Sequence, residues 1–155
     1  RLSPKAADRF YQLLKHDYFK NILFYRVAPG FVAQFGTSDS VLSNNWSAIK
    51  IPDEKVIQSN LRGTLSFARG GVETRGTTLF INLKDNERLD TLRYTGVTGF
   101  PSFGRVINGM QVLDSLYSGY GDTTMSDYEM MFENKTEFLE KYPKLDSIYT
   151  AYILK

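Results

Sequence analysis

The sequence has no cysteine and only one histidine among its 155 residues. The lack of cysteine excludes disulfide bonds, thiolate nucleophiles and cysteine metal sites together. The single histidine, His16, falls in a predicted helix and is interpreted as a solvated surface residue, so we expect neither a metal nor another cofactor. No apolar run reaches 18 residues, and the sequence therefore predicts no membrane-spanning helix.

The sequence also has no strong excess of positive or negative charge. The 19 basic and 17 acidic residues give a net charge of +2 and are interspersed along the chain. Because no basic run or stripe occurs, nucleic acid is not an expected partner. Hydrophobic residues make up 42% and charged residues 23% of the chain, values typical of a globular protein. We expect one domain over residues 1–155, acting as a monomer.

The sequence opens at Arg1 without a methionine or a hydrophobic leader. We therefore expect it to be a processed or excised piece of a longer chain, which leaves a secreted or membrane-anchored form open. The triplets that begin at Asn45 and Asn134 match the glycosylation motif, and they would matter only in a secreted protein.

Periodicity predicts short strands joined by loops. Ser3-Pro4 followed by apolar residues at helical spacing predicts a helix over residues 4–16. Strands are expected over 22–27, 31–35, 63–68, 78–83 and 102–107, with a strand-like tail over 147–154. Residues 37–62 and 84–101 are predicted to be long loops. Further helices are expected after Asn108, closed by Gly119 and Gly121, and between Asn134 and Pro143. Many short strands without a βαβ rhythm favour a mainly β barrel or sandwich with two or three helices.

The most informative stretch covers residues 24–36. It joins two short apolar runs by a Pro-Gly turn and carries an arginine, several aromatic residues and an amide. It reads Phe24-Tyr25-Arg26-Val27-Ala28-Pro29-Gly30-Phe31-Val32-Ala33-Gln34-Phe35-Gly36. This segment resembles the central motif of the cyclophilin family of peptidyl-prolyl isomerases, Phe-His-Arg-Val-x-Pro-Gly-Phe-x-x-Gln-x-Gly.

Two further blocks carry the same resemblance in the same order. Residues 63–81 are similar to the family's Gly-x-Leu-Ser-Met-Ala-Asn-x-Gly-x-x-x-x-Gly-Ser-Gln-Phe-Phe-Ile. Residues 103–114 are similar to its Phe-Gly-x-Val-x-x-Gly-Met-x-Val-Val-x. The Gly-rich bend at 69–77, with Arg69 and Arg75, could otherwise form a phosphate cradle, but it lacks the Gly-Lys-Ser/Thr ending of a P-loop and no helix is expected after it.

The resemblance implies a closed, eight-stranded antiparallel barrel capped by helices. Members of the family begin with one or two strands before the first helix, whereas this sequence starts almost at that helix. A barrel without its first strand would expose a sheet edge. Either the missing strand lies outside this sequence or the barrel is open here.

The resemblance also implies a function and a site. The expected reaction is rotation about X–Pro peptide bonds, which assists protein folding and acts on proline-containing peptides or client proteins. Arg26 matches the arginine that stabilises the rotating amide. The residues expected to bind substrate are Phe31, Val32, Gln34, Ala68, Arg69, Phe80, Leu89 and Phe100. Simple strand parity places Gln34 on the face opposite Phe31, unless the strand twists or bulges there.

Several positions depart from the family pattern. Tyr25 replaces a histidine, Arg69 an asparagine and Thr78 a glutamine. Arg88 stands where many members have tryptophan, and Phe100 replaces a pocket-edge histidine. Loss of the indole donor and its flat surface at Arg88 predicts weakened binding of cyclosporin.

These departures keep three readings open. The first is an active peptidyl-prolyl isomerase. The second is a cyclophilin-like module that binds proline-containing segments with little turnover. The third is a structural barrel whose site has decayed. The acidic residues Asp85, Glu87 and Asp90 are interpreted as a solvated turn.

Overall fold

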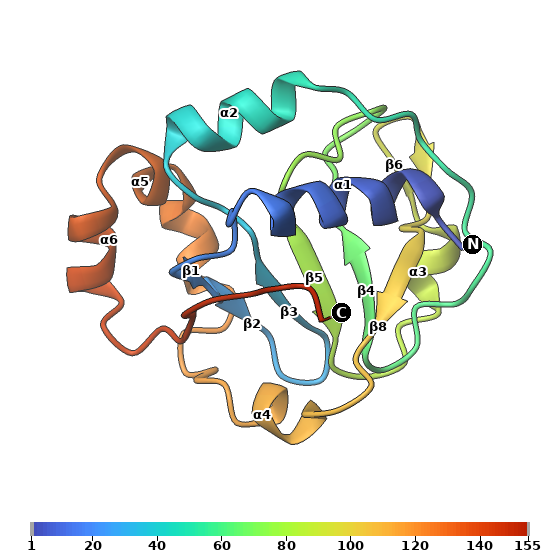
Figure 1. The fold of residues 1–155 in the computed structure, drawn as a ribbon. Coiled ribbons are helices and arrows are strands. Elements are labelled where there is room, and N and C mark those ends of the chain that lie inside the picture. Colours follow the sequence, from blue (N-terminus) through green and yellow to red (C-terminus); the bar gives the residue numbers. More distant parts are fainter. Residues whose placement is uncertain (1, 155) are drawn as a thin grey trace.

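The centre of the protein is a five-stranded antiparallel sheet (Figure 1). The computed structural model describes residues 2–154. Neighbours in the sheet follow the order β2-β3-β5-β4-β8. The strands are β2 (Arg26–Val27), β3 (Val32–Phe35), β4 (Thr64–Phe67), β5 (Leu79–Asn82) and β8 (Ser102–Arg105).

Helices and two short pairs of antiparallel strands surround this sheet (Figure 1). The paired strands are β1 (Ile22–Leu23) with β9 (Ser147–Ile148) and β6 (Arg93–Tyr94) with β7 (Val97–Thr98). The helices are α1 (Pro4–Lys15), α2 (Ser40–Ala48), α3 (Arg88–Thr91), α4 (Met110–Asp114), α5 (Tyr128–Glu133) and α6 (Lys135–Lys141), with a 3₁₀ turn η1 (Thr123–Asp127).

The expected closed eight-stranded barrel is wrong for this chain. Within residues 2–154 the sheet is open, because β2 pairs only with β3 and β8 pairs only with β4. The predicted strand over 22–27 divides into β1 and β2, which belong to different sheets. With six α-helices, the fold is mixed α/β and not mainly β with two or three helices.

Both predicted long loops contain regular structure. Residues 37–62 include α2, whose first turn is capped by the Asp39 carboxylate accepting from the Leu42 amide at 2.9 Å. Residues 84–101 include α3 and the β6–β7 pair. The polar residues that suggested loops therefore serve as helix caps and exposed faces.

The predicted helices exist with shifted ends. The first spans residues 4–15, and His16 follows it as an exposed cap residue, as expected. The helix after Asn108 begins past Gly109, which adopts φ 86°, and it ends at Asp114, well before the two glycines expected to close it. The helix after Asn134 is confirmed as α6, with the Asn134 side chain accepting from the Glu137 amide at 3.3 Å. The tail is strand only at Ser147–Ile148.

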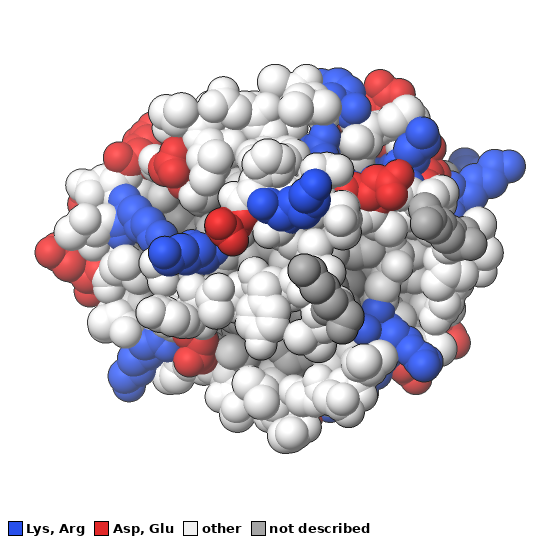
Figure 2. All heavy atoms as spheres, viewed as in Figure 1, with Lys and Arg blue, Asp and Glu red and all other residues white. Residues whose placement is uncertain are grey.

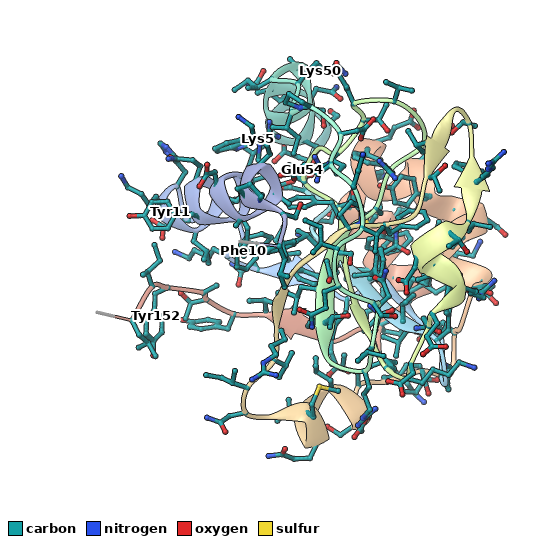
Figure 3. The ribbon with its side chains drawn as sticks, turned by 90° about the vertical axis from the view of Figure 1, so that its right-hand side faces the viewer. Lys5, Phe10, Tyr11, Lys50, Glu54 and Tyr152 are labelled. Carbon is teal, nitrogen blue, oxygen red and sulfur yellow. The ribbon has the colours of Figure 1, made fainter. Side chains whose placement is uncertain are left out.

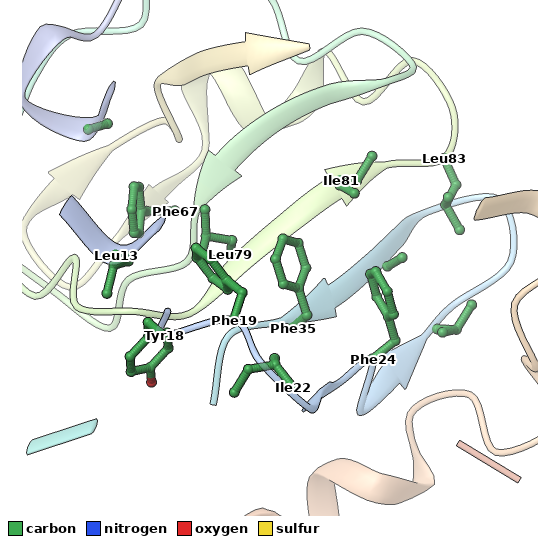
Figure 4. Close-up of a cluster of buried hydrophobic side chains, with 13 residues drawn as sticks. Leu13, Tyr18, Phe19, Ile22, Phe24, Phe35, Phe67, Leu79, Ile81 and Leu83 are labelled. Carbon is green, nitrogen blue, oxygen red and sulfur yellow. The ribbon is translucent and has the colours of Figure 1, made fainter. Parts of the chain in front are cut away.

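The main core lies between α1 and one face of the sheet (Figure 4). Successive side chains of a strand point to opposite faces. Phe35 and Ala33 of β3, with Leu79 and Ile81 of β5, therefore all point into this core. Phe19 stacks against Phe35 with ring centroids 5.8 Å apart. The alternate residues of the same strands are left to face the other side of the sheet.

A second core joins the start of the sheet to α5 and α6. It contains Leu23, Tyr25, Met131, Phe138 and Tyr142, all buried. Burial raises the pKa of Tyr25 well above its usual range, and its hydroxyl has no hydrogen-bond partner among the described residues. Tyr25 is therefore a packing residue in the position where the motif usually holds histidine.

Buried ion pairs fasten the segment after α2 to the first helix. The Ser3 side chain, which precedes α1, makes no capping bond to the helix, and its hydroxyl donates to the carboxylate of Glu54. Glu54 itself accepts from the amides of Lys5 at 2.9 Å and Ala6 at 3.2 Å, so it caps the helix from fifty residues away. Figure 3 shows Glu54 beside the first turn of α1, near Lys5. The fully buried guanidinium of Arg75 donates to the same carboxylate at 3.0 Å.

The surface outside this cluster carries charges of both signs. On the face shown in Figure 2, lysine and arginine side chains alternate with aspartate and glutamate. Among residues 2–154, no helix is long and apolar enough to cross a membrane.

Replacing Glu54 tests the importance of this cap. Glu54→Gln leaves the buried Arg75 guanidinium with only the more distant carboxylate of Asp53, at 3.9 Å, and we expect a loss of about 3 kcal/mol in unfolding free energy at pH 7. Burial alone would raise the pKa of Glu54, but hydrogen bonds from Ser3, Lys5 and Arg75 outweigh it and lower the pKa.

The stability difference between wild type and Glu54→Gln should also depend on pH. Because the pKa of Glu54 is lower in the folded state than in the unfolded state, its carboxylate stabilises the fold. This stabilisation is fully present above the unfolded-state pKa, about 4.3, and is lost as the pH falls through the folded-state pKa. Urea denaturation between about pH 7 and pH 3 should therefore show the gap between wild type and Glu54→Gln narrowing below about pH 4. A gap that stays constant down to the lowest pH would show that the Glu54 charge does not supply this stability.

Candidate functional site

A pocket opens on the face of the sheet opposite the main core. Its volume is about 230 Å³, and it lies among β2, β3, β5, α3 and the segments that flank them. Its lining includes all nine residues expected from the sequence, together with Tyr94. The lining residues are Arg26, Phe31, Val32, Gln34, Ala68, Arg69, Phe80, Leu89, Tyr94 and Phe100.

The register of the sheet brings these side chains together. Arg26 lies opposite Gln34, and Gln34 lies opposite Phe80. Facing residues on paired strands share one side of the sheet. Val32 and Gln34, two positions apart on β3, therefore both face the pocket, and Phe31 enters it from the turn that precedes the strand. The parity difference between Phe31 and Gln34 needs no bulge, because Phe31 is not part of β3.

One wall of the pocket is apolar. Val32, Phe80 and Leu89 form a buried cluster against which Phe31, Ala68 and Phe100 pack. The rings of Phe80 and Phe100 meet edge to face, with centroids 5.8 Å apart. A wall of this kind accepts a small apolar ring and excludes water from it.

Arg26 lines the same pocket, beside Phe31. Its Nε donates to Asp122 Oδ1 at 2.6 Å, and its Nη1 donates to Gln34 Oε1 at 3.1 Å. Its guanidinium carbon lies 5.5 Å from the centre of the Phe31 ring. In the described part of the chain Nη2 has no partner, so two of the three nitrogens are held and the third keeps its N–H groups free.

Arg69 lines the pocket but its charge is directed elsewhere. The guanidinium is buried and donates to Asp53 at 2.8 Å, to the Thr98 carbonyl at 2.9 Å and to the Gly99 carbonyl. It also lies 5.6 Å from the ring of Phe100. Arg69 therefore fixes the segment that leads into Phe100, and its side chain has no free edge among the described residues except a buried Nε.

A network of side-chain amides supports the pocket from below. Asp90 accepts from the backbone and the side chain of Asn60, at 2.9 and 2.7 Å, and Asn60 donates to the Phe100 carbonyl at 2.9 Å. Asn86 donates to the Phe31 carbonyl at 2.9 Å. The interpretation of Asp90 as part of a solvated turn is therefore wrong, because its carboxylate binds Asn60, which in turn holds the Phe100 carbonyl.

Two residues of the site were not predicted from the sequence. Tyr94 belongs to the β6–β7 pair, which was expected to be loop, and its side chain is half exposed at the pocket edge. Asp122 contacts Arg26 from a segment 96 positions later. No pattern in the sequence marks either one, because both contacts depend on how distant segments fold together.

Comparison with known proteins shows the family of this chain. Residues 1–135 match the family described as cyclophilin type peptidyl-prolyl cis-trans isomerase/CLD. A peptidyl-prolyl cis-trans isomerase of Acinetobacter baylyi is 33% identical over 116 residues, which cover 74% of this chain and 61% of that protein. Human peptidyl-prolyl cis-trans isomerase-like 3 is 32% identical over 118 residues, covering 74% of this chain and 69% of that protein.

Solved structures show the same likeness in the fold. A cyclophilin type peptidyl-prolyl cis-trans isomerase of Cryptosporidium parvum is similar with a TM-score of 0.57 and 26% identity, over 72% of this chain and 69% of that one. The chain thus spans less than two thirds of the Acinetobacter protein and slightly more of the other two. On the matched family profile, the shared fold and the identities above 30%, this chain belongs to the cyclophilin-type peptidyl-prolyl cis-trans isomerase family.

Proposed function

We propose that this protein catalyses cis–trans isomerisation of X–Pro peptide bonds in peptides or folding client proteins. The observation that carries the proposal is that one pocket is lined both by Arg26, whose Nη2 has no partner in the described part of the chain, and by an apolar wall of Val32, Phe80 and Leu89. A Cryptosporidium parvum relative, 25% identical, was crystallised in the presence of the dipeptide Ala-Pro. A proline ring is the occupant that we expect here.

The chemistry needs neither a nucleophile nor a cofactor. Partial double-bond character gives the peptide C–N bond a rotational barrier of about 18–20 kcal/mol. At the top of the barrier the conjugation is lost, and the nitrogen becomes pyramidal and able to accept a hydrogen bond. A donor that meets the twisted nitrogen, but not the planar amide, lowers the barrier because it binds the transition state more strongly than the ground state.

Arg26 supplies this donor in the proposal. A guanidinium is charged at every accessible pH, so no proton has to be gained or lost in the cycle. Asp122 and Gln34 fix two of its edges and leave Nη2 for the substrate. The apolar wall removes competing water, which strengthens the donor's electrostatic effect.

The remaining residues bind the substrate. Phe31, Val32, Phe80, Leu89 and Phe100 hold the proline ring, while Gln34 and the backbone at Ala68 and Arg69 hold the peptide on one side of the rotating bond. Anchoring one side is required, because a peptide that turns as a whole does not twist its C–N bond.

A second candidate function is binding with little turnover. Arg26 is already paired with Asp122 at 2.6 Å, and this carboxylate partly offsets the field that a proline nitrogen would meet. Thr78, Arg88 and Phe100 add further departures from the family motif. Under this reading the pocket would take up proline-containing segments without accelerating their isomerisation.

The Arg26→Ala variant separates the two functions. We expect the wild type to accelerate the exchange between cis and trans forms of a short proline peptide, and Arg26→Ala to lose at least about a hundredfold in kcat/KM, the scale of a lost electrostatic donor. Exchange NMR measures the rate, and Arg105→Ala, an exposed arginine of β8 outside the pocket lining, is the matched control.

The results have distinct meanings. Equal rates for wild type and Arg26→Ala would exclude the catalytic role. Shifts at Phe31 and Phe80 on adding peptide, without faster exchange in the wild type, would establish the binding function instead.

Asp122→Asn tests the positioning of the guanidinium. The variant removes the charge that holds Nε but keeps a similar shape, and Gln34 remains as the second anchor. Because small misplacements of a donor cost rate, we expect a fall of roughly fivefold in kcat with little change in KM. An unchanged or increased kcat would show that Asp122 does not position Arg26 for the reaction.

Cyclosporin affinity tests the expectation about Arg88. We expect the wild type to bind the drug weakly, and Arg88→Trp to bind it more tightly by about tenfold, since an indole restores a donor and a flat apolar surface. Isothermal titration calorimetry is the better measurement, because the fluorescence of the native Trp46 would overlap with that of the introduced tryptophan. Equal affinities for the two proteins would contradict the prediction.

A further inference from the structure

Three guanidiniums border the pocket, and their charge pairing differs. Arg26 has the carboxylate of Asp122 at 2.6 Å, and Arg69 has that of Asp53 at 2.8 Å. Arg88, in α3 next to the pocket residue Leu89, has no carboxylate within 4.0 Å in the described part of the chain. Of these three arginines, it alone lacks a carboxylate partner among the described residues, and it lies against the pocket residue Phe31.

Arg88 is nevertheless held in one place. Its guanidinium carbon lies 4.7 Å from the centre of the Phe31 ring, closer than that of Arg26 at 5.5 Å. A guanidinium over an aromatic face uses its π surface for the contact, and its N–H groups remain in the plane, directed outward. The side chain is exposed, so these donors face solvent beside a pocket wall.

None of the neighbouring carboxylates lies within ion-pair distance of Arg88 in the described part of the chain. Asp90 accepts from Asn60 beneath the pocket, and Asp85 accepts from the Arg62 amide at 2.8 Å. Glu87 precedes Arg88 in sequence but lies beyond ion-pair distance from it. A fixed, unpaired cation at a binding edge favours an anionic group on the ligand.

We propose that Arg88 makes this pocket selective for peptides that carry an aspartate or glutamate side chain close to the proline. The inference rests on the proposed binding of a proline ring in the pocket, and it names the substrate class. Phe31 both lines the pocket and supports Arg88, so the guanidinium lies within one or two residues of a seated proline, given about 3.3–3.6 Å per extended residue. A planar guanidinium can take a carboxylate through two parallel hydrogen bonds.

Matched peptides test the selectivity. Each contains one proline and carries Glu, Gln or Lys at one of the two positions before or the two positions after it. Affinity is measured from NMR shifts of pocket residues, and isomerisation is measured by exchange on the same samples. At one of these positions we expect Glu to bind about fivefold more tightly than Gln, and Lys more weakly than both, with the Glu advantage shrinking at about 1 M salt.

Variants assign the effect to Arg88. Arg88→Gln should bring the Glu-to-Gln affinity ratio close to one, and Arg88→Glu should reverse the order so that Lys peptides bind best. Arg105→Gln changes the net charge by the same amount on an exposed residue outside the pocket lining, and it should keep the wild-type ratio.

The outcomes separate this inference from the proposed catalysis. A Glu preference that disappears in Arg88→Gln supports the inference even where exchange is not accelerated. Accelerated exchange with equal affinities for Glu and Gln peptides at all four positions overturns the inference. Arg88 would then only pack against Phe31. A preference that survives in Arg88→Gln, or the absence of any peptide binding, also overturns it.

Discussion

The site depends on the register of the central antiparallel sheet. Arg26, Gln34, Phe80 and Ser66 face one another across β2, β3, β5 and β4, so they form one row on one side of the sheet. A shift of one residue in any strand would turn its members of this row into the core. The alternation that points Phe35 and its neighbours into the core therefore also places Arg26, Gln34 and Phe80 together on the pocket side.

This row of residues places polar side chains in a buried environment, where they need hydrogen-bond partners. Neighbouring side chains and carbonyls supply such partners. Ser66, at the end of the row, donates to the Asn60 side chain at 2.9 Å, and Asn60 in turn is bound to Asp90 and to the Phe100 carbonyl. Buried polar groups are tolerated when they are paired, and a paired network also specifies one arrangement. The pocket aromatics are thus fixed through their backbone as well as by packing.

Local patterns predicted the parts of the fold and site that depend on short segments. The residues around the Pro29-Gly30 turn indicated both the strands and the position of Arg26, because a turn and its flanking strands are set by neighbouring residues. The nine expected lining residues do meet in one pocket, but they were found by resemblance to a family motif, since pleat parity alone could not relate Phe31 to Gln34. Short helices such as α2 and α3 were missed, because their stability comes from tertiary contacts more than from propensity.

Contacts between distant segments set the electrostatics of the site, and these lay beyond sequence reasoning. Asp122 reaches Arg26 across 96 positions, and Asp53 reaches Arg69 across 16. Each pairing converts a free cation into a positioned one, and each decides how much charge a ligand meets. The three arginines look equivalent in the sequence, and their roles differ only in the fold. Arg26 is a donor held through two of its nitrogens, Arg69 is buried and binds backbone carbonyls, and Arg88 is exposed and contacts the Phe31 ring. Since a guanidinium does not titrate in the accessible range, the position of each arginine and its pairing with a carboxylate set the charge that the described residues present at the pocket.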